Sequence, residues 1–489
     1  MSTIKALAAS STAALALALS GCTTANIPGS TAPITQSEAQ MGAEAHPQLL
    51  AEFGGAMTGS QAQYVQQVGQ NIAVQSGLGN ARESFTVSML NSSVNNAFAI
   101  PGGFVYTTRQ LVTLMDNEAE LAAVLGHEVG HVAARHSQRR QANQQRNTLL
   151  GAGAAILSGI LLGNSGIGQQ IGQAALQGSQ LLTLSFSRGQ ELEADTLGIR
   201  YLTQAGYDPT AMATVLASLA AQNSLDARIQ GRDDARLPAW ASTHPDPASR
   251  VQQALATAQG TSGITNRDTF LERIDGLMYG DDPEQGIIEG RQFIQPVMRL
   301  SFTAPQGYYL LNGTRAVSIN GQSGQAQFTL APYSGNLENY VASVFAELGG
   351  DQQQLRPQSI QRTTVNGLPA AYGTARVNSG QGEVEVVVFA YEFANDRAYH
   401  FQVITQPGGA SAFTPMFNSL RRISAAEAAN VVPRHIEIAT VRAGDTIRTL
   451  ANRMAYDNGQ LERFLVLNSL DANDTLRTGD KVKLVVRGR

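Results

Sequence analysis

Hydrophobic and polar positions repeat with two different periods along the chain, and the change between them predicts its first elements. A helical period runs through SQAQYVQQVGQNIAVQSG (60–77), 117–136, GQELEADTLGIRYLTQAG (189–206) and DPTAMATVLASLAAQ (208–222). Between the first two, SFTVSML (84–90) alternates as a strand does, and NNAFAIPGGFVYTT (95–108) predicts strand, Pro-Gly-Gly turn and strand. Residues 45–275 are therefore expected to form one mainly helical domain with a small β-sheet.

The pattern changes after about residue 281, where short alternating segments are separated by Gly, Asn and Pro. Two helical segments, near 337–348 and 412–420, interrupt them. Residues 285–425 are thus predicted to be an α+β domain with an antiparallel sheet, which resembles the PsbP/Mog1-like sandwich in outline. No charge constellation assigns it a role.

The last region, 434–487, predicts strand, helix, helix, strand, with Asp445 or Thr446 as the cap of its first helix. Its segments AGDTIRTLA, LNSLDANDTL and GDKVKLV resemble a LysM module, the small βααβ domain that binds N-acetylglucosamine polymers. The resemblance implies peptidoglycan as a partner. The chain as a whole is predicted to be multidomain.

The start of the chain has the pattern of a secretory signal. Lys5 precedes an apolar run, and the run ends in LSGC, which resembles a bacterial lipobox with Cys22 as the lipidated residue. We expect a lipoprotein signal peptide over 1–21 and a lipidated cysteine with its tether over 22–44. Thr23 after the cysteine favours the outer membrane by analogy. The alternative is a plain signal peptide with a chance cysteine.

Two features of composition narrow the partners. The formal net charge is −4 with only 15% charged residues, and no basic stripe is present, which argues against nucleic acid. Residues 147–187 carry no charge, but the apolar part, TLLGAGAAILSGILLG, is shorter than a bilayer span and contains glycines. A buried or membrane-surface hairpin is favoured over a span.

The segment GHEVGHVAARH (126–136) carries the clearest chemistry. His127 and His131 are four residues apart on the predicted helix, so two neutral imidazoles on one face can reach a single zinc ion. Glu128 is turned by about 100° from His127, where it can face a water molecule as general base. The competing interpretation is a solvated helix with paired histidines. A catalytic site needs a third ligand, and Glu191 and Glu193 are both candidates.

These motifs, with the strand NAFAIPGG, the loop STHPDP and the later Glu191-x-x-x-Asp195, resemble the HtpX and CAAX-prenyl-protease family of gluzincin metallopeptidases, in its soluble periplasmic, BepA-like branch. The resemblance implies one zinc ion per chain, held by His127, His131 and Glu191. Asp195, on the same helix face as Glu191, is expected to accept an N–H from a ligand histidine. For Glu193 a solvated surface carboxylate is favoured.

Four further residue assignments follow. The segment Asn96, Ala97, Phe98 and Ala99 is expected to be an edge strand that pairs with an extended substrate, with a plain internal strand as the alternative. His244 could donate to the oxyanion, bind zinc as a fourth ligand that closes the site, or only stabilise a turn. Arg250 is expected to pair with a carboxylate, and His136 to lie past the metal face.

Two functions compete on these grounds. The first is a lipid-anchored zinc endopeptidase of the bacterial envelope, in the periplasm at the outer membrane, that degrades unfolded or misassembled proteins. The second is an envelope assembly factor or chaperone that binds clients with a resting, self-inhibited protease fold. The complete ligand set with Glu128 favours the first, because a pure binding protein needs no base.

Overall fold

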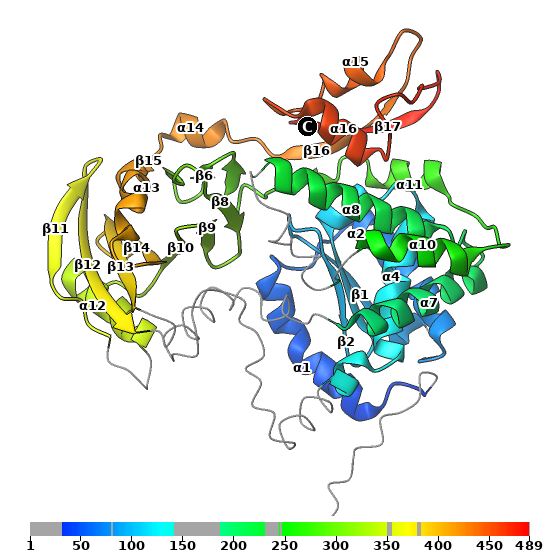
Figure 1. Ribbon diagram of the computed structural model, residues 1–489, viewed down its shortest axis with the longest axis horizontal. Coiled ribbons are helices and arrows are strands. Elements are labelled where there is room, and N and C mark those ends of the chain that lie inside the picture. The colour runs from blue at the N-terminus through cyan, green and yellow to red at the C-terminus, as the bar shows by residue number, and fades with distance from the viewer. Residues whose placement is uncertain are drawn as a thin grey trace, which may run out of the picture.

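The computed structural model describes residues 32–79, 82–140, 186–229, 244, 247–349, 355–378 and 383–488. The predicted signal peptide, Cys22, residues 23–31 of the tether and almost all of the uncharged segment 147–187 lie outside this range. The tether was predicted to extend to residue 44, but residues 36–44 form the first part of helix α1 (Gln36–Glu52). Figure 1 shows a helical region, a region built on a large sheet, and a small C-terminal module above the helices. Among the described residues, no helix is both long enough and apolar enough to cross a bilayer.

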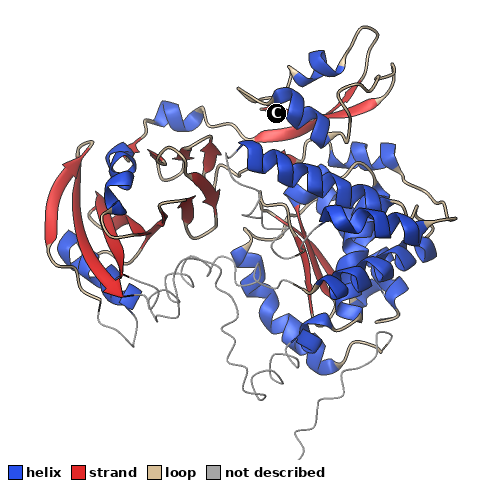
Figure 2. Ribbon diagram, viewed as in Figure 1, coloured by secondary structure: helices blue, strands red, loops and turns tan. Residues whose placement is uncertain are grey.

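The helical region contains the elements that the hydrophobic pattern predicts (Figure 2). Its helices are α1 (Gln36–Glu52), α2 (Ser60–Ala73), α3 (Arg109–Leu114), α4 (Glu118–Ala133), α7 (Arg188–Ala205), α8 (Ala211–Ile229), α10 (Pro247–Ala258) and α11 (Arg267–Ile274). Side-chain caps fix the first residues of two helices: Asn117 accepts a hydrogen bond from the backbone N–H of Glu120, and Ser187 forms a capping box with Gln190.

Helix α4 occupies the interior of this region. Every residue of the helix except Val132 is buried, including Leu121, Val124 and Leu125. Helix α4 therefore has no single apolar face, because it is packed on all sides. Any polar group in its second half must find its partners inside the protein.

The small sheet has the order β1-β3-β2. Strand β1 (Thr86–Leu90) runs parallel to β3 (Phe104–Thr108), and β2 (Ala97–Ile100) pairs with β3 as an antiparallel hairpin. Strand β2 lies at the edge of the sheet and packs against α4. The predicted substrate segment is thus an edge strand next to the motif helix.

The second region is an α+β domain with a large antiparallel sheet, as predicted. Seven strands follow the order β11-β12-β13-β14-β10-β9-β8, and a smaller sheet has the order β15-β7-β6-β5. Aromatic side chains such as Phe302, Phe328 and Phe401 fill the core on one face of the large sheet. Helix α12 (Leu337–Gly349) packs on β12 and β13 with a second core. The PsbP/Mog1-like assignment stays a prediction.

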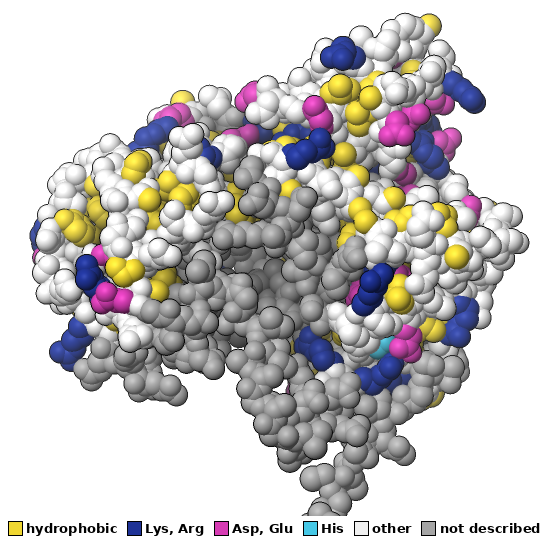
Figure 3. Space-filling view, viewed as in Figure 1, with side chains coloured by type: hydrophobic (Ala, Val, Ile, Leu, Met, Phe, Trp, Pro, Cys, Tyr) yellow, Lys and Arg dark blue, Asp and Glu magenta, His cyan; other side chains and the backbone are white. Residues whose placement is uncertain are grey.

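The remaining elements of this domain have the following bounds: β5 (Ile287–Glu289), β6 (Gln292–Gln295), β7 (Leu300–Thr303), β8 (Tyr309–Asn312), β9 (Val317–Gly321), β10 (Gly324–Leu330), β11 (Ile360–Val365), β12 (Leu368–Asn378), β13 (Glu383–Ala394), β14 (Arg397–Thr405), α13 (Thr414–Ser419) and β15 (Arg421–Arg422). Helix α14 (Ala425–Ala429) leads out of it. On the face that Figure 3 shows, Lys and Arg side chains are scattered among acidic ones, so the described part of this face has no single-sign surface.

The C-terminal module has the predicted element order: β16 (Arg434–Thr440), α15 (Ile447–Ala451), α16 (Gln460–Leu467) and β17 (Lys481–Arg487), and Thr446 caps α15. In its described residues, the module has no hydrophobic core separate from that of the helical region. Strand β4 (Met278–Tyr279), which follows α11 in the chain, pairs with β16, and buried residues of the module join the hydrophobic core of the helical region. The LysM resemblance stays a prediction.

Lys483 of β17 joins the module to the helical region. Its ammonium group is fully buried and donates to the carbonyl oxygens of Thr113, Leu114 and Met115 at 3.2, 3.1 and 2.7 Å. It also forms an ion pair with Asp116 at 3.0 Å. The four acceptors lie between the end of α3 and the start of α4, so the module is fixed at the N-terminal end of the motif helix.

We predict that Lys483→Met lowers the free energy of unfolding by about 3–5 kcal/mol, because the buried Asp116 carboxylate and three carbonyl groups lose their partner. Urea unfolding followed by circular dichroism measures the change. Lys481, on the same strand, pairs with Glu272 at 2.8 Å and supplies the control. Lys481→Met should leave the unfolding midpoint unchanged; equal midpoints for the two variants would contradict the role of Lys483.

Candidate metal centre

Helix α4 contributes two imidazoles to a buried site. His127 and His131, only 2% and 4% exposed, direct their Nε2 atoms toward each other at a distance of 3.0 Å. The spacing of four residues places both rings on one helix face, as predicted. Glu128, 1% exposed, lies beside them.

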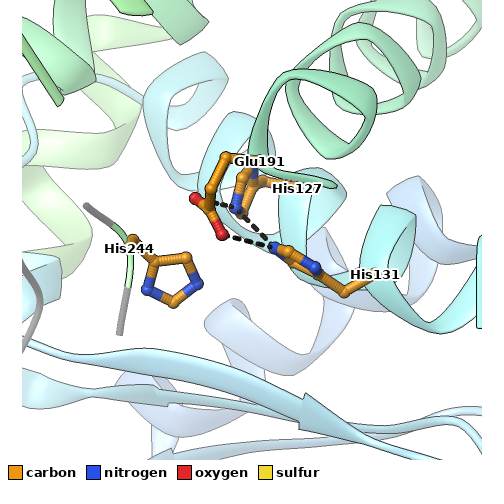
Figure 4. A group of neighbouring side chains, drawn as sticks. All are labelled: His127, His131, Glu191 and His244. Carbon is orange, nitrogen blue, oxygen red and sulfur yellow. Dashed lines mark hydrogen bonds and ion pairs between the residues drawn. The ribbon is translucent and has the colours of Figure 1, made fainter. Parts of the chain in front are cut away.

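Helix α7 adds Glu191, which is fully buried in its first turn. Its Oε2 lies 3.6 Å from His127 Nε2 and its Oε1 lies 3.5 Å from His131 Nε2 (Figure 4). The two helices can approach this closely because glycines line their crossing. A β-carbon on Gly130 would lie 3.0 Å from the carbonyl oxygen of Ala194, and one on Gly198 would lie 3.1 Å from the backbone nitrogen of His127.

Asp195 holds His127 from the side away from the site. Its Oδ1 lies 2.9 Å from His127 Nδ1, as expected for a carboxylate that accepts the N–H of a ligand histidine. Because Asp195 can only accept, His127 Nδ1 carries the proton and its Nε2 lone pair is directed into the site. The Asp195 carboxylate therefore sets the tautomer of His127.

Arg250 of α10 connects two of the carboxylates. Its Nε and one Nη donate to both oxygens of Asp195 at 2.7 and 2.5 Å, and its other Nη donates to Glu191 Oε2 at 2.7 Å. The expectation that Arg250 pairs with a carboxylate is confirmed, and this residue, only 1% exposed, in fact pairs with two. A planar guanidinium is suited to such a fork.

His244 reaches the same group from a separate segment of the chain (Figure 4). A nitrogen of His244 lies within 4.8 Å of donor atoms of His127, His131 and Glu191, and its Nε2 lies 3.3 Å from Glu128 Oε1. Burial lowers the pKa of His244 to about 3, so its imidazole is neutral at pH 7. His244 therefore lies beside the three donors and the predicted base, and not in a turn remote from the site.

Burial also sets the charge states of the acidic groups. It raises the pKa of Glu128 and of Glu191 to about 7 each, against the opposing effect of the Arg250 guanidinium. In Asp195 burial acts in the same direction, but the hydrogen bonds from Arg250 and His127 outweigh it and hold the pKa well below its usual range. Hydrogen-bond donors thus stabilise the negative charge of Asp195, whereas the charges of Glu128 and Glu191 are stabilised less.

The donor set fits a divalent metal ion. Two imidazole nitrogens and a carboxylate converge with separations of 3.0–3.6 Å, close to the edge of about 3.4 Å of a zinc tetrahedron. Glu191 Oε1 is buried and receives no hydrogen bond, which a cation between the donors would compensate. The group of His127, His131, Glu191 and His244 is the one such cluster found among the described residues.

Three contacts around the site were not foreseen. His136 lies outside the donor group, as expected, but its Nδ1 lies 2.8 Å from His131 Nδ1. Glu193, expected to be solvated, is 40% exposed and pairs with His136 and Arg139. Phe186 stacks on the His131 ring with centroids 4.1 Å apart. No helical spacing relates His136 to His131, so the pattern alone held no signal for their contact.

Comparison with known proteins agrees with this site. The model of peptidase family M48 matches residues 59–258. The chain is similar to the beta-barrel assembly-enhancing protease of Escherichia coli O157:H7, with 35% identity over 46% of this chain and 45% of the relative. It is also similar to mitochondrial metalloendopeptidase OMA1 of Schizosaccharomyces pombe, with 30% identity over 44% and 59% of the two chains.

Metalloprotease LoiP of Escherichia coli K12 is 32% identical over 32% of this chain and 56% of its own. The chain therefore spans about half the length of the relatives that it matches. The family match includes His127, His131 and Glu191. These findings confirm the predicted resemblance: residues 59–258 of the chain match the model of peptidase family M48.

Proposed function

We propose that this chain is a zinc-dependent endopeptidase of the bacterial cell envelope. The observation that carries the proposal is the buried convergence of His127, His131 and Glu191 with Glu128 beside them. Two imidazoles and one carboxylate are the protein ligands of a catalytic zinc site, which keeps its fourth position for water or substrate.

The residues of the chain have separate tasks in this proposal. When bound, zinc lowers the pKa of a water molecule and polarises the substrate carbonyl. Glu128 accepts the proton of the attacking water and returns it to the leaving amine. Asp195 and Arg250 hold His127 and Glu191 in place. The segment Asn96, Ala97, Phe98 and Ala99 leads into and forms most of strand β2, which is an edge strand among the described residues and can pair with an extended peptide, which favours unfolded substrates.

His244 supports a resting state of the same enzyme. A neutral imidazole so close to the other three donors can act as a fourth ligand and exclude water, which would close the site. The same observation favours the second candidate function, an assembly factor or chaperone that binds clients with a closed protease site. An oxyanion donor in an open state is the other task that His244 could have.

The cellular setting rests on the start of the chain and on the relatives. The lipobox-like segment with Cys22 supports a lipid anchor, in the periplasm at the outer membrane. Two relatives are named as proteases that enhance the assembly of β-barrels, and closed β-barrels are the proteins that span that membrane. We therefore propose misassembled outer-membrane or periplasmic proteins as substrates, with the C-terminal module as a contact to peptidoglycan.

Glu128→Gln should retain one equivalent of zinc per chain and lose cleavage of casein by about 10²–10⁴-fold, because an amide cannot accept the proton. Metal analysis and a casein assay on the chain from Thr23 onward measure both. Glu272→Gln, an exposed carboxylate on α11, is the control and should match the wild type. Full cleavage by Glu128→Gln would refute the mechanism, and zinc without cleavage in the wild type would favour the chaperone.

His244→Ala should raise casein cleavage by about tenfold or more, since a closing contact worth less than about 1.4 kcal/mol would not hold the site shut. Its zinc content should stay at one equivalent, because three ligands remain. The double variant His244→Ala/Glu128→Gln is the control and should be inactive. A fall in cleavage with zinc retained would rule out the lock and assign His244 to the oxyanion.

A further inference from the structure

A second series of contacts reaches His131 from outside the donor group. His131 Nδ1 lies 2.8 Å from His136 Nδ1, and His136 Nε2 lies 3.1 Å from Glu193 Oε2. His136 is fully buried, and its ring and that of His131 both contact Phe186. The carboxylate at the outer end also pairs with Arg139 at 2.9 Å.

The positions of the protons give this series of contacts a direction. Two Nδ1 atoms at hydrogen-bond distance share one proton, and a carboxylate such as Glu193 can only accept. The Nε2 of a neutral His136 therefore carries its proton toward Glu193, and its Nδ1 accepts from His131. His131 is then protonated on Nδ1, and its Nε2 lone pair faces His127 Nε2 and Glu191, as a metal ligand requires.

We infer that His136 and Glu193 are positioning residues that fix the tautomer and ring orientation of His131 for metal binding. This inference rests on the proposed metal site. It gives the two histidines matching supports from one helix, because Asp195 acts on His127 directly and Glu193 acts on His131 through His136. Glu191, Glu193 and Asp195 of α7 would all serve one ion.

The turn after α4 supplies an independent observation. Helix α4 ends at Ala133, and Arg135 adopts a left-handed conformation with φ of 50°, which L-residues rarely take. That turn brings His136 back to His131 despite a spacing of five residues. The buried Arg135 side chain holds the turn by donating to the carbonyls of Ala32, Pro33 and Ala133 and by pairing with Glu38. A strained residue held this firmly is typical of a functional site.

The test compares two replacements of His136 in the full chain from Thr23 onward. Asn at 136 can accept from His131 Nδ1 and donate to Glu193, whereas Leu can do neither. His136→Leu should weaken zinc binding by about 10–100-fold in competition with a chromophoric chelator, and His136→Asn should restore most of the affinity. Glu193→Ala, at a partly exposed position that tolerates change, should weaken it about tenfold.

Arg139→Gln is the matched control, since it removes an exposed partner of Glu193 and leaves the series of contacts to His131 intact; its zinc affinity should change less than twofold. Nitrogen-15 NMR of the metal-free protein gives a readout that does not depend on zinc. His131 should carry its proton on Nδ1 in the wild type and lose this preference in His136→Leu and Glu193→Ala.

The outcomes separate this inference from the proposed function. Unchanged zinc affinity in both His136→Leu and Glu193→Ala, or a proton on His131 Nε2 in the wild type, would overturn the inference and leave the endopeptidase proposal standing. The expected affinities with no cleavage by any variant would do the reverse. A wild-type chain that binds no zinc would overturn both.

Discussion

The site depends on how closely α4 and α7 cross. Glutamate is too short to bridge two helices at an ordinary separation, and only the absence of β-carbons at Gly130 and Gly198 lets the backbones meet. Substitution of Gly198 by a larger residue would press on Met212 and on the backbone of His127, so it would displace a donor directly. The same crossing places Arg250 within reach of two carboxylates on α7.

The net charge of the buried site is the second constraint. Glu128, Glu191 and Asp195 bring three carboxylates into a space that solvent does not reach, and Arg250 supplies one positive charge. A formal excess of two negative charges in a buried volume is unfavourable unless protons or a cation compensate it. The raised pKa values of Glu128 and Glu191 express the first solution. A divalent ion among the donors would be the second, and it would leave Glu128 ionised, as the proposed base requires.

Local signals in the sequence predicted the elements well. Hydrophobic periodicity located α4, and the spacing of His127 and His131 located half of the donor set. The contacts that support the donors depend on tertiary geometry. Arg250 approaches from a helix far along the chain, and His136 returns through a left-handed turn at Arg135 that no propensity favours. The interior position of α4 was hidden for a related reason, since packing on all sides leaves no apolar face to read.

The C-terminal module shows why a change of sequence texture does not mark a mechanical boundary. Strand β4 leaves the helical region and joins the module's sheet, and one hydrophobic core runs through both. Lys483 binds the carbonyls just before α4, while the Arg135 turn fixes the chain just after it. The motif helix is therefore held at both ends by contacts distant in sequence, and its donors lie in the half nearest the Arg135 turn. A module that holds one end of this helix cannot move as a free tether without disturbing the donors that the helix carries.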